Sequence, residues 1–153
     1  MSKPKYTTAQ KRSQRYLRSV RLAERRIQVL EAEIELQQSR LTLNGVSGGE
    51  NVKATMQGDS MEQGFTKLYE LCDSLDTDLI GYVEEREEAL NVLKHLSNPN
   101  HYMILYLRYF QGLSFSQVAN IMNYTERNVF KLHLQALSAL HAYLPVQYRK
   151  RVQ

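Results

Sequence analysis

The sequence predicts an all-α protein, in which a long, coiled-coil-like N-terminal helical hairpin precedes a C-terminal helix-turn-helix bundle. Residues 8–43 and 61–97 each place apolar residues in alternating steps of three and four, which is the spacing of one helix face. Residues 113–140 hold two shorter apolar patterns, and each opens with a hydroxyl residue that can cap a helix. No stretch shows the strict alternation of apolar and polar residues that is typical of strands.

The first predicted domain, residues 1–43, is a basic heptad helix that starts near Thr8 and continues without Gly or Pro. Residues 1–26 carry nine Lys or Arg against Glu24 alone, a net charge of +8, which suits contact with a polyanion. Residues 44–60 contain four glycines and form a predicted flexible linker. The predicted seam of this helix is Tyr16, Val20, Ala23, Ile27, Leu30, Ile34, Gln37 and Leu41.

Residues 61–97 form the second predicted heptad helix, which ends before Pro99 because proline disfavours helix at the residue before it. Two heptad helices joined by a flexible linker pair as an antiparallel hairpin or within a dimeric bundle. The linker allows both, so pairing within one chain and between chains stays open. The predicted seam of the second helix is Phe65, Leu68, Cys72, Leu75, Leu79, Tyr82, Arg86, Ala89, Leu93 and Leu96.

Residues 100–144 form the predicted helix-turn-helix domain of three short helices, and residues 145–153 form a basic tail that is expected to fray after Pro145. Ser114 and Gln117 have the spacing of a capping box at the start of the second short helix. Asn123 tolerates the left-handed conformation that a tight corner requires. Thr125 caps the third helix, whose predicted inner side is Val129, Leu132, Ala136, Leu137 and Leu140.

The outward side of this third helix carries side chains of the kinds that contact DNA. Arginine pairs with guanine, Asn and Gln pair with adenine, Glu accepts from cytosine, an aromatic ring meets the thymine methyl group, and Lys suits a phosphate. Which base each side chain reads stays open. The predicted DNA-binding residues are Thr125, Glu126, Arg127, Asn128, Phe130, Lys131 and Gln135.

The stretch "LRYFQGLSFSQVANIMNYTERNVFKLHLQALSAL", residues 107–140, resembles region four of sigma-70-type factors. The resemblance is carried by "LRYF", "GLS", "VA", the capping Thr125, "ERNV" and "ALSAL", and it implies that the helix after the turn reads promoter DNA in the major groove. Asn123 stands where that family usually has Gly, and Phe130 where it usually has a basic residue. The whole layout resembles phage sigma-like regulators of the ArpU and RinA type, which activate late genes, and it has no counterpart of sigma region two.

These observations predict a cytoplasmic, sequence-specific regulator of transcription that binds double-stranded DNA, homodimerises through its heptad helices and contacts RNA polymerase. No apolar run reaches the length of a membrane helix, and the single Cys72 excludes an internal disulfide. No catalytic residue, metal ligand set or cofactor motif is recognised, so no enzymatic activity is expected. Two alternatives stay open: a phage terminase small subunit, and a polymerase-binding module that scarcely touches DNA.

Overall fold

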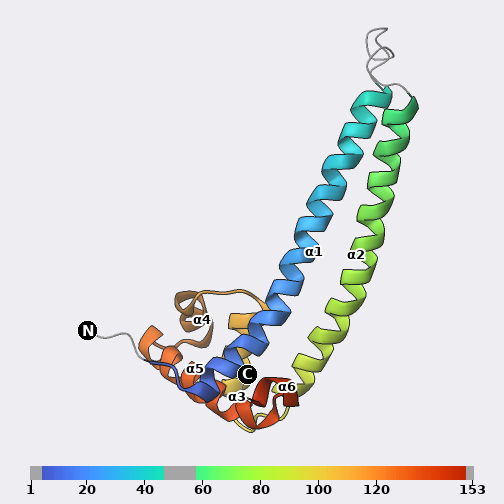
Figure 1. Ribbon diagram of the computed structural model, residues 1–153. Helices are drawn as coiled ribbons and strands as arrows, with labels where there is room; N and C mark the ends of the chain where they lie inside the picture. Colours follow the sequence, from blue (N-terminus) through green and yellow to red (C-terminus); the bar gives the residue numbers. More distant parts are fainter. Residues whose placement is uncertain (1–4, 47–57, 151–153) are drawn as a thin grey trace. The chain divides into compact units, whose positions relative to one another are not determined.

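The computed structural model of the protein describes residues 5–46 and 58–150, and these residues contain helices but no strand (Figure 1). The all-α fold, with two long helices before a helix-turn-helix bundle, is therefore confirmed. Residues 47–57 of the predicted linker, residues 1–4 of the basic arm and residues 151–153 of the tail lie outside the described residues. The elements are α1 (Thr8–Val46), α2 (Gly58–Leu93), α3 (Pro99–Leu105), the π-helical turn η1 (Tyr106–Phe110), α4 (Phe115–Met122), α5 (Glu126–Leu140), the 3₁₀ turn η2 (His141–Tyr143) and α6 (Val146–Arg149).

The chain divides into two compact units, here called the hairpin unit (residues 23–83) and the reading unit (residues 1–22 with 84–153). In the hairpin unit, α1 and α2 run antiparallel, side by side, within one chain (Figure 1). Gly64 lets them approach closely, because a Cβ atom added there would lie 2.7 Å from Cδ2 of Leu41. The side-chain amide of Gln37 donates a 3.1 Å hydrogen bond to the Gly64 carbonyl oxygen at the same place.

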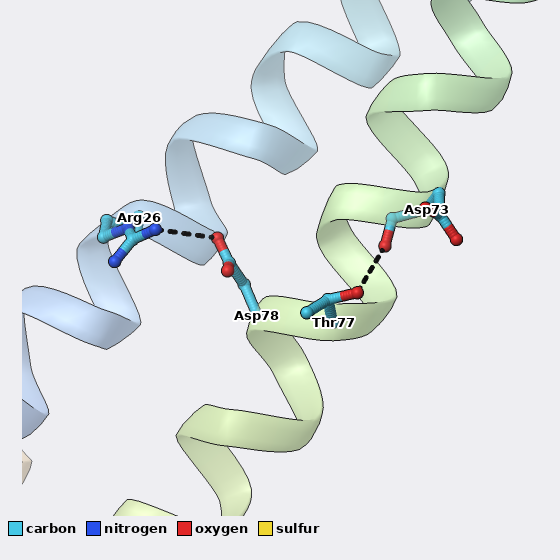
Figure 2. Close-up of polar contacts among 4 residues, drawn as sticks. All are labelled: Arg26, Asp73, Thr77 and Asp78. Carbon is cyan, nitrogen blue, oxygen red and sulfur yellow. Dashed lines mark hydrogen bonds and ion pairs between the residues drawn. The ribbon is translucent and has the colours of Figure 1, made fainter.

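An ion pair also joins the two helices of the hairpin unit. Arg26 Nη2 lies 3.5 Å from Asp78 Oδ2, and the adjacent Thr77 donates a hydrogen bond to the carbonyl of Asp73, one turn earlier in α2 (Figure 2). The Arg26 side chain is 73% exposed, so solvent screens this pair and its contribution to stability is small. This ion pair therefore adds little to the stability of the hairpin unit.

In the hairpin unit the α1 seam is placed as predicted, and the α2 seam is so placed except at two positions. Ala23, Leu30, Ile34, Gln37 and Leu41 are half-buried and Ile27 is buried. On α2, Leu68, Cys72, Leu75 and Tyr82 are half-buried, whereas Phe65 and Leu79 are 56% and 42% exposed within the single chain. Gly64 occupies the close approach instead of Phe65, since a residue without a side chain lets the backbones come nearer. The half-buried face of α2 here is Gly64, Leu68, Leu71, Cys72, Leu75, Asp78, Gly81 and Tyr82.

In the reading unit, the start of α1 packs against α5 through both apolar and polar contacts. Leu17 of α1 is only 1% exposed. The Gln10 side-chain amide donates 3.0 Å hydrogen bonds to the Leu134 carbonyl and to Ser138 Oγ. The buried Ser13 hydroxyl donates to the Leu137 carbonyl at 2.7 Å. The basic N-terminal segment is therefore a structural part of the unit that contains the helix-turn-helix.

The described part of the predicted tail forms a short helix after Pro145, contrary to the fraying expected there. Residues Val146–Arg149 form α6, and the Tyr148 ring lies 4.9 Å from the Tyr16 ring of α1. Arg15 lies over the same Tyr148 ring at 5.3 Å, and Arg12 donates to the Arg149 carbonyl at 2.9 Å. These contacts involve residues far apart in sequence, so the composition of the tail gave no sign of them.

Candidate nucleic-acid interface

The first helix of the helix-turn-helix, α4, begins at the predicted capping box. The Gln117 amide donates to Ser114 Oγ at 3.2 Å, and the Ser114 amide donates to Gln117 Oε1 at 2.9 Å. These reciprocal bonds satisfy backbone N–H groups that have no partner within the helix. Val118 and Ala119 of this helix are buried in the apolar core that α4 shares with its neighbours.

The corner between α4 and α5 has the predicted geometry. Asn123 adopts the left-handed conformation, with φ 61° and ψ 42°, and ends α4. The Tyr124 amide donates to the Ala119 carbonyl at 2.9 Å. Thr125 Oγ1 then accepts a 3.1 Å hydrogen bond from the Asn128 amide, and α5 starts at Glu126. Local hydrogen bonds thus fix both the end of one helix and the start of the next.

A small apolar core sets the orientation of α5 against α3, η1 and α4. Its buried members come from all four elements, and Leu132 and Met122 pack against it from the edge. Because protein interiors are packed as densely as crystals, such a core fixes the rotation of α5 about its own axis. That rotation decides which side chains face outward. The buried members are Ile104, Leu107, Val118, Ala119 and Val129.

Six of the seven predicted DNA-binding residues are exposed at the corner or on α5, and this exposed surface is the open side of α5. Thr125, Glu126, Arg127 and Asn128 are exposed at the start of α5, and Lys131 and Gln135 are exposed on its next two turns. This open side therefore offers two cations, two amides and one carboxylate to a ligand.

Phe130 lies apart from the other six. It is half-buried and makes edge-on contacts with Phe115 at 5.5 Å and with Tyr6 at 6.3 Å between ring centroids. Phe130 thus packs α5 against α4 and the start of the chain.

His133 is a buried residue of α5 that the sequence analysis missed. Its side chain is 0% exposed, and its Nε2 lies 2.9 Å from the hydroxyl of Tyr109. It falls on the same stripe as Val129 and Leu137, and this periodicity was the signal that could have found it. Burial, assisted by the positive charges of Arg108 and Arg18, lowers the pKa of His133 to about 4, so the imidazole is neutral at physiological pH.

The neutral His133 belongs to a polar network that also involves α1. The Gln14 side chain donates a 3.3 Å hydrogen bond to the Tyr109 hydroxyl. Burial is the main reason that the pKa of Tyr109 is raised, so this phenol also stays neutral. The network therefore links η1, α5 and α1 behind the open side of α5 without placing a charge in the core.

Residues 92–142 match the family model Sigma-70, region 4. The match covers about a third of the chain and includes α3, η1, α4 and α5. It indicates a region-4-like helix-turn-helix domain that binds DNA and acts in transcription, and this family is regulatory rather than enzymatic. Comparison with curated proteins and with solved structures gave no significant match.

The reading unit is larger than the region-4 match, because residues 5–22 and α6 also belong to it. Among the described residues, no group of three or more His, Cys, Asp or Glu side chains could hold a metal ion. In the same part of the chain, no helix is long and apolar enough to cross a membrane.

Proposed function

We propose that the protein is a sequence-specific regulator of transcription that binds double-stranded DNA, and that it activates late genes of a phage or prophage. The observation that carries the DNA-binding part is the exposed polar side of α5 in a region-4-like helix-turn-helix. The phage role is supported by the layout, in which a basic heptad helix and a second heptad helix precede this domain. RNA polymerase is the proposed protein partner, by analogy with region four.

In this proposal the start of α5 enters the major groove. Arg127 and Asn128 are exposed on the first turn of the helix and are assigned to base edges, with Glu126 and Gln135 beside them. Lys131 is assigned to a backbone phosphate, and Thr125 presents the capped start of the helix to the same backbone. Phe130 is assigned a positioning role, because its ring is engaged by Phe115 and Tyr6.

The test is selection of bound genomic fragments, followed by binding titrations on the selected site and on random DNA. Replacing Arg127 with Ala should cost about 1–3 kcal/mol on the selected site and relax the preference at one base position. Replacing Lys131 with Ala should weaken binding to all sequences and lower the salt slope by about 1. Lys94→Ala, an exposed lysine outside α5, is the control and should change neither quantity.

The proposal fails if no genomic fragment is bound at least about tenfold more tightly than random DNA, since specific binders gain about 10³ or more. The variant in which both Arg127 and Lys131 are replaced with Ala separates DNA binding from polymerase binding. If it keeps its affinity for DNA but no longer binds RNA polymerase, the domain is a protein-interaction module instead. Retention of polymerase binding with loss of DNA binding is the expected result.

We also propose that the hairpin unit forms the homodimer that places two reading helices on one duplex, about 34 Å apart. Two helices bury little on their own: among the residues of this unit whose burial is described, only Ile27 is fully buried. Large apolar side chains remain exposed, and a second copy of the same unit is a suitable cover for them. They include Val29, Leu36, Phe65, Tyr69, Ile80 and Val83, which are 46–75% exposed.

Replacing both Val29 and Leu36 with Glu should convert the dimer to a monomer, because the variant puts charge where apolar contact is proposed. Sedimentation equilibrium measures the mass of the particle. This mass should equal that of two chains for the native protein and that of one chain for the variant. Gln28→Glu, at an exposed polar position of the same helix, should leave the dimer intact. A native monomer contradicts the proposal, and a ring of eight or more copies favours the terminase alternative.

A further inference from the structure

We propose that Arg18 and Arg21 of α1, together with Arg108 of η1, bind backbone phosphates of the duplex that α5 reads. These three residues form the proposed arginine clamp. The inference rests on the proposed DNA-binding function and adds a contact surface outside the region-4 match, since Arg18 and Arg21 precede it in the chain. It makes α1 a DNA-contacting helix of the reading unit as well as a packing element.

Two of the three guanidinium groups lie on the short loop that leads into α4. Arg21 lies over Gly112, where Nη2 would be 3.2 Å from an added Cβ atom, and Gly112 has a φ of +70°. Leu113 follows Gly112 in this loop, and its carbonyl accepts a 2.9 Å hydrogen bond from Nη1 of Arg108. The Cζ atom of Arg108 lies 4.4 Å from the centre of the Phe115 ring. Both side chains are half-buried, so the loop and the ring limit their motion.

Arg18 lies one turn before Arg21 on α1 and is exposed. Its charge acts on the same buried pair as that of Arg108. After burial, which is the largest cause, Arg108 and Arg18 both lower the pKa of His133. Both charges also act to lower the pKa of Tyr109, against the larger effect of burial. Both positive charges therefore act on the same buried pair, although they come from helices far apart in sequence.

No arginine of this set forms an ion pair within the described part of the chain, where the pair present is that of Arg26 with Asp78 in the other unit. The carboxylates of the same unit are Glu126 and the glutamates at the end of α2, of which Glu85 and Glu88 act on Tyr16 of α1. Positive charges without a paired carboxylate favour the binding of an anion beside them. Guanidinium groups suit phosphates because each can donate two parallel hydrogen bonds to one anion.

The position of the clamp selects duplex DNA as the source of the phosphate. In helix-turn-helix proteins the first helix crosses the DNA backbone while the second lies in the groove. The clamp lies at the loop before that first helix, α4. It is linked to the reading helix by two ring contacts: Arg108 lies on Phe115, and Phe115 contacts Phe130 at 5.5 Å. A strand whose bases meet α5 would therefore pass this side of α4.

The experiment compares two double variants of the full-length protein that remove the same charge from the same helix. Replacing Arg18 and Arg21 with Ala should weaken binding to the selected site and to random DNA by the same factor. The slope of log affinity against log salt should fall by about 2, because each lost phosphate contact contributes about 0.9. The base preference should not change, because phosphate contacts carry no sequence information.

Replacing Lys11 and Arg15 with Ala provides the matched control, since both are exposed on α1 and Arg15 lies over Tyr148 instead. This variant should leave the salt slope nearly unchanged. Equal losses from the two double variants would mean diffuse attraction to a basic helix and would overturn the clamp. A changed base preference with an unchanged slope would show that the arginines only position α5, and would also overturn it.

The single variant Arg18→Ala keeps the test valid if loss of Arg21 disturbs the loop, because Arg18 is exposed. The slope of log affinity against log salt should fall by about 1 in this variant. An unchanged slope would contradict the clamp. Replacing Arg18 and Arg21 with Lys should keep the slope while lowering the affinity, because Lys retains the charge but not the paired donors. If the native protein binds all DNA sequences equally, the proposed function has failed. If the native protein prefers one sequence but the Ala variants keep its salt slope, the clamp alone is rejected.

Discussion

Lowering the pH from 7 to below 4 is expected to destabilise the reading unit by on the order of 3 kcal/mol through His133 alone. The side chain is fully buried, and its pKa is about 4 in the folded protein against 6.5 in the unfolded chain. The unfolded chain therefore binds a proton more readily at every pH between these values. The stabilisation is fully present above pH 6.5 and is lost progressively as the pH falls towards 4.

The measurement is urea unfolding at several pH values between 7 and 4, on the native protein and on His133→Phe. Phe suits the aromatic surroundings that Phe115 and Phe130 provide, and the Tyr109 hydroxyl keeps its bond from Gln14. The variant should show a shallower loss of stability with acid, while His95→Gln, at an exposed histidine, should follow the native curve. Superimposable pH profiles for the native protein and His133→Phe would contradict the prediction.

Replacing Leu17 with Ala is expected to lower the free energy of unfolding of the reading unit by about 2–5 kcal/mol. Leu17 is 1% exposed on α1, and its removal leaves a cavity where α1 meets the rest of this unit. The position lies far outside residues 92–142, which match region four. A large effect there would establish that the DNA-binding unit includes the start of α1.

Leu22→Ala is the matched control for this substitution. It makes the same chemical change on the same helix, but Leu22 is 57% exposed, so its effect should stay within about 0.5 kcal/mol. Chemical denaturation followed by near-ultraviolet circular dichroism reports the reading unit, where Tyr16, Tyr109 and Tyr148 are packed. Equal effects of the two substitutions would show that α1 does not stabilise this unit.

The parts of the interface that depend on neighbours in sequence were predictable. The capping box of Ser114 and Gln117, the left-handed Asn123 and the Thr125 cap all form as the sequence predicted, because each depends on residues three or four apart. The open side of α5 followed from its periodicity for the same reason. The burial of His133 did not follow from neighbours in sequence, because a polar residue on an apolar stripe faces the core only when the surrounding helices supply a partner for it.

The sequence by itself determined that this protein is all-α, where its helix-turn-helix corner lies and which polar residues the reading helix turns outward, because helix periodicity and capping act over a few residues. Only the tertiary structure decided that α1 and α6 complete the reading unit, that Phe130 packs against Tyr6 and Phe115, and that Arg21 and Arg108 meet at one loop. These contacts join residues that are distant in the chain. They arise because apolar faces and unpaired polar groups find partners only when the helices pack, and no local pattern specifies which partner each will meet.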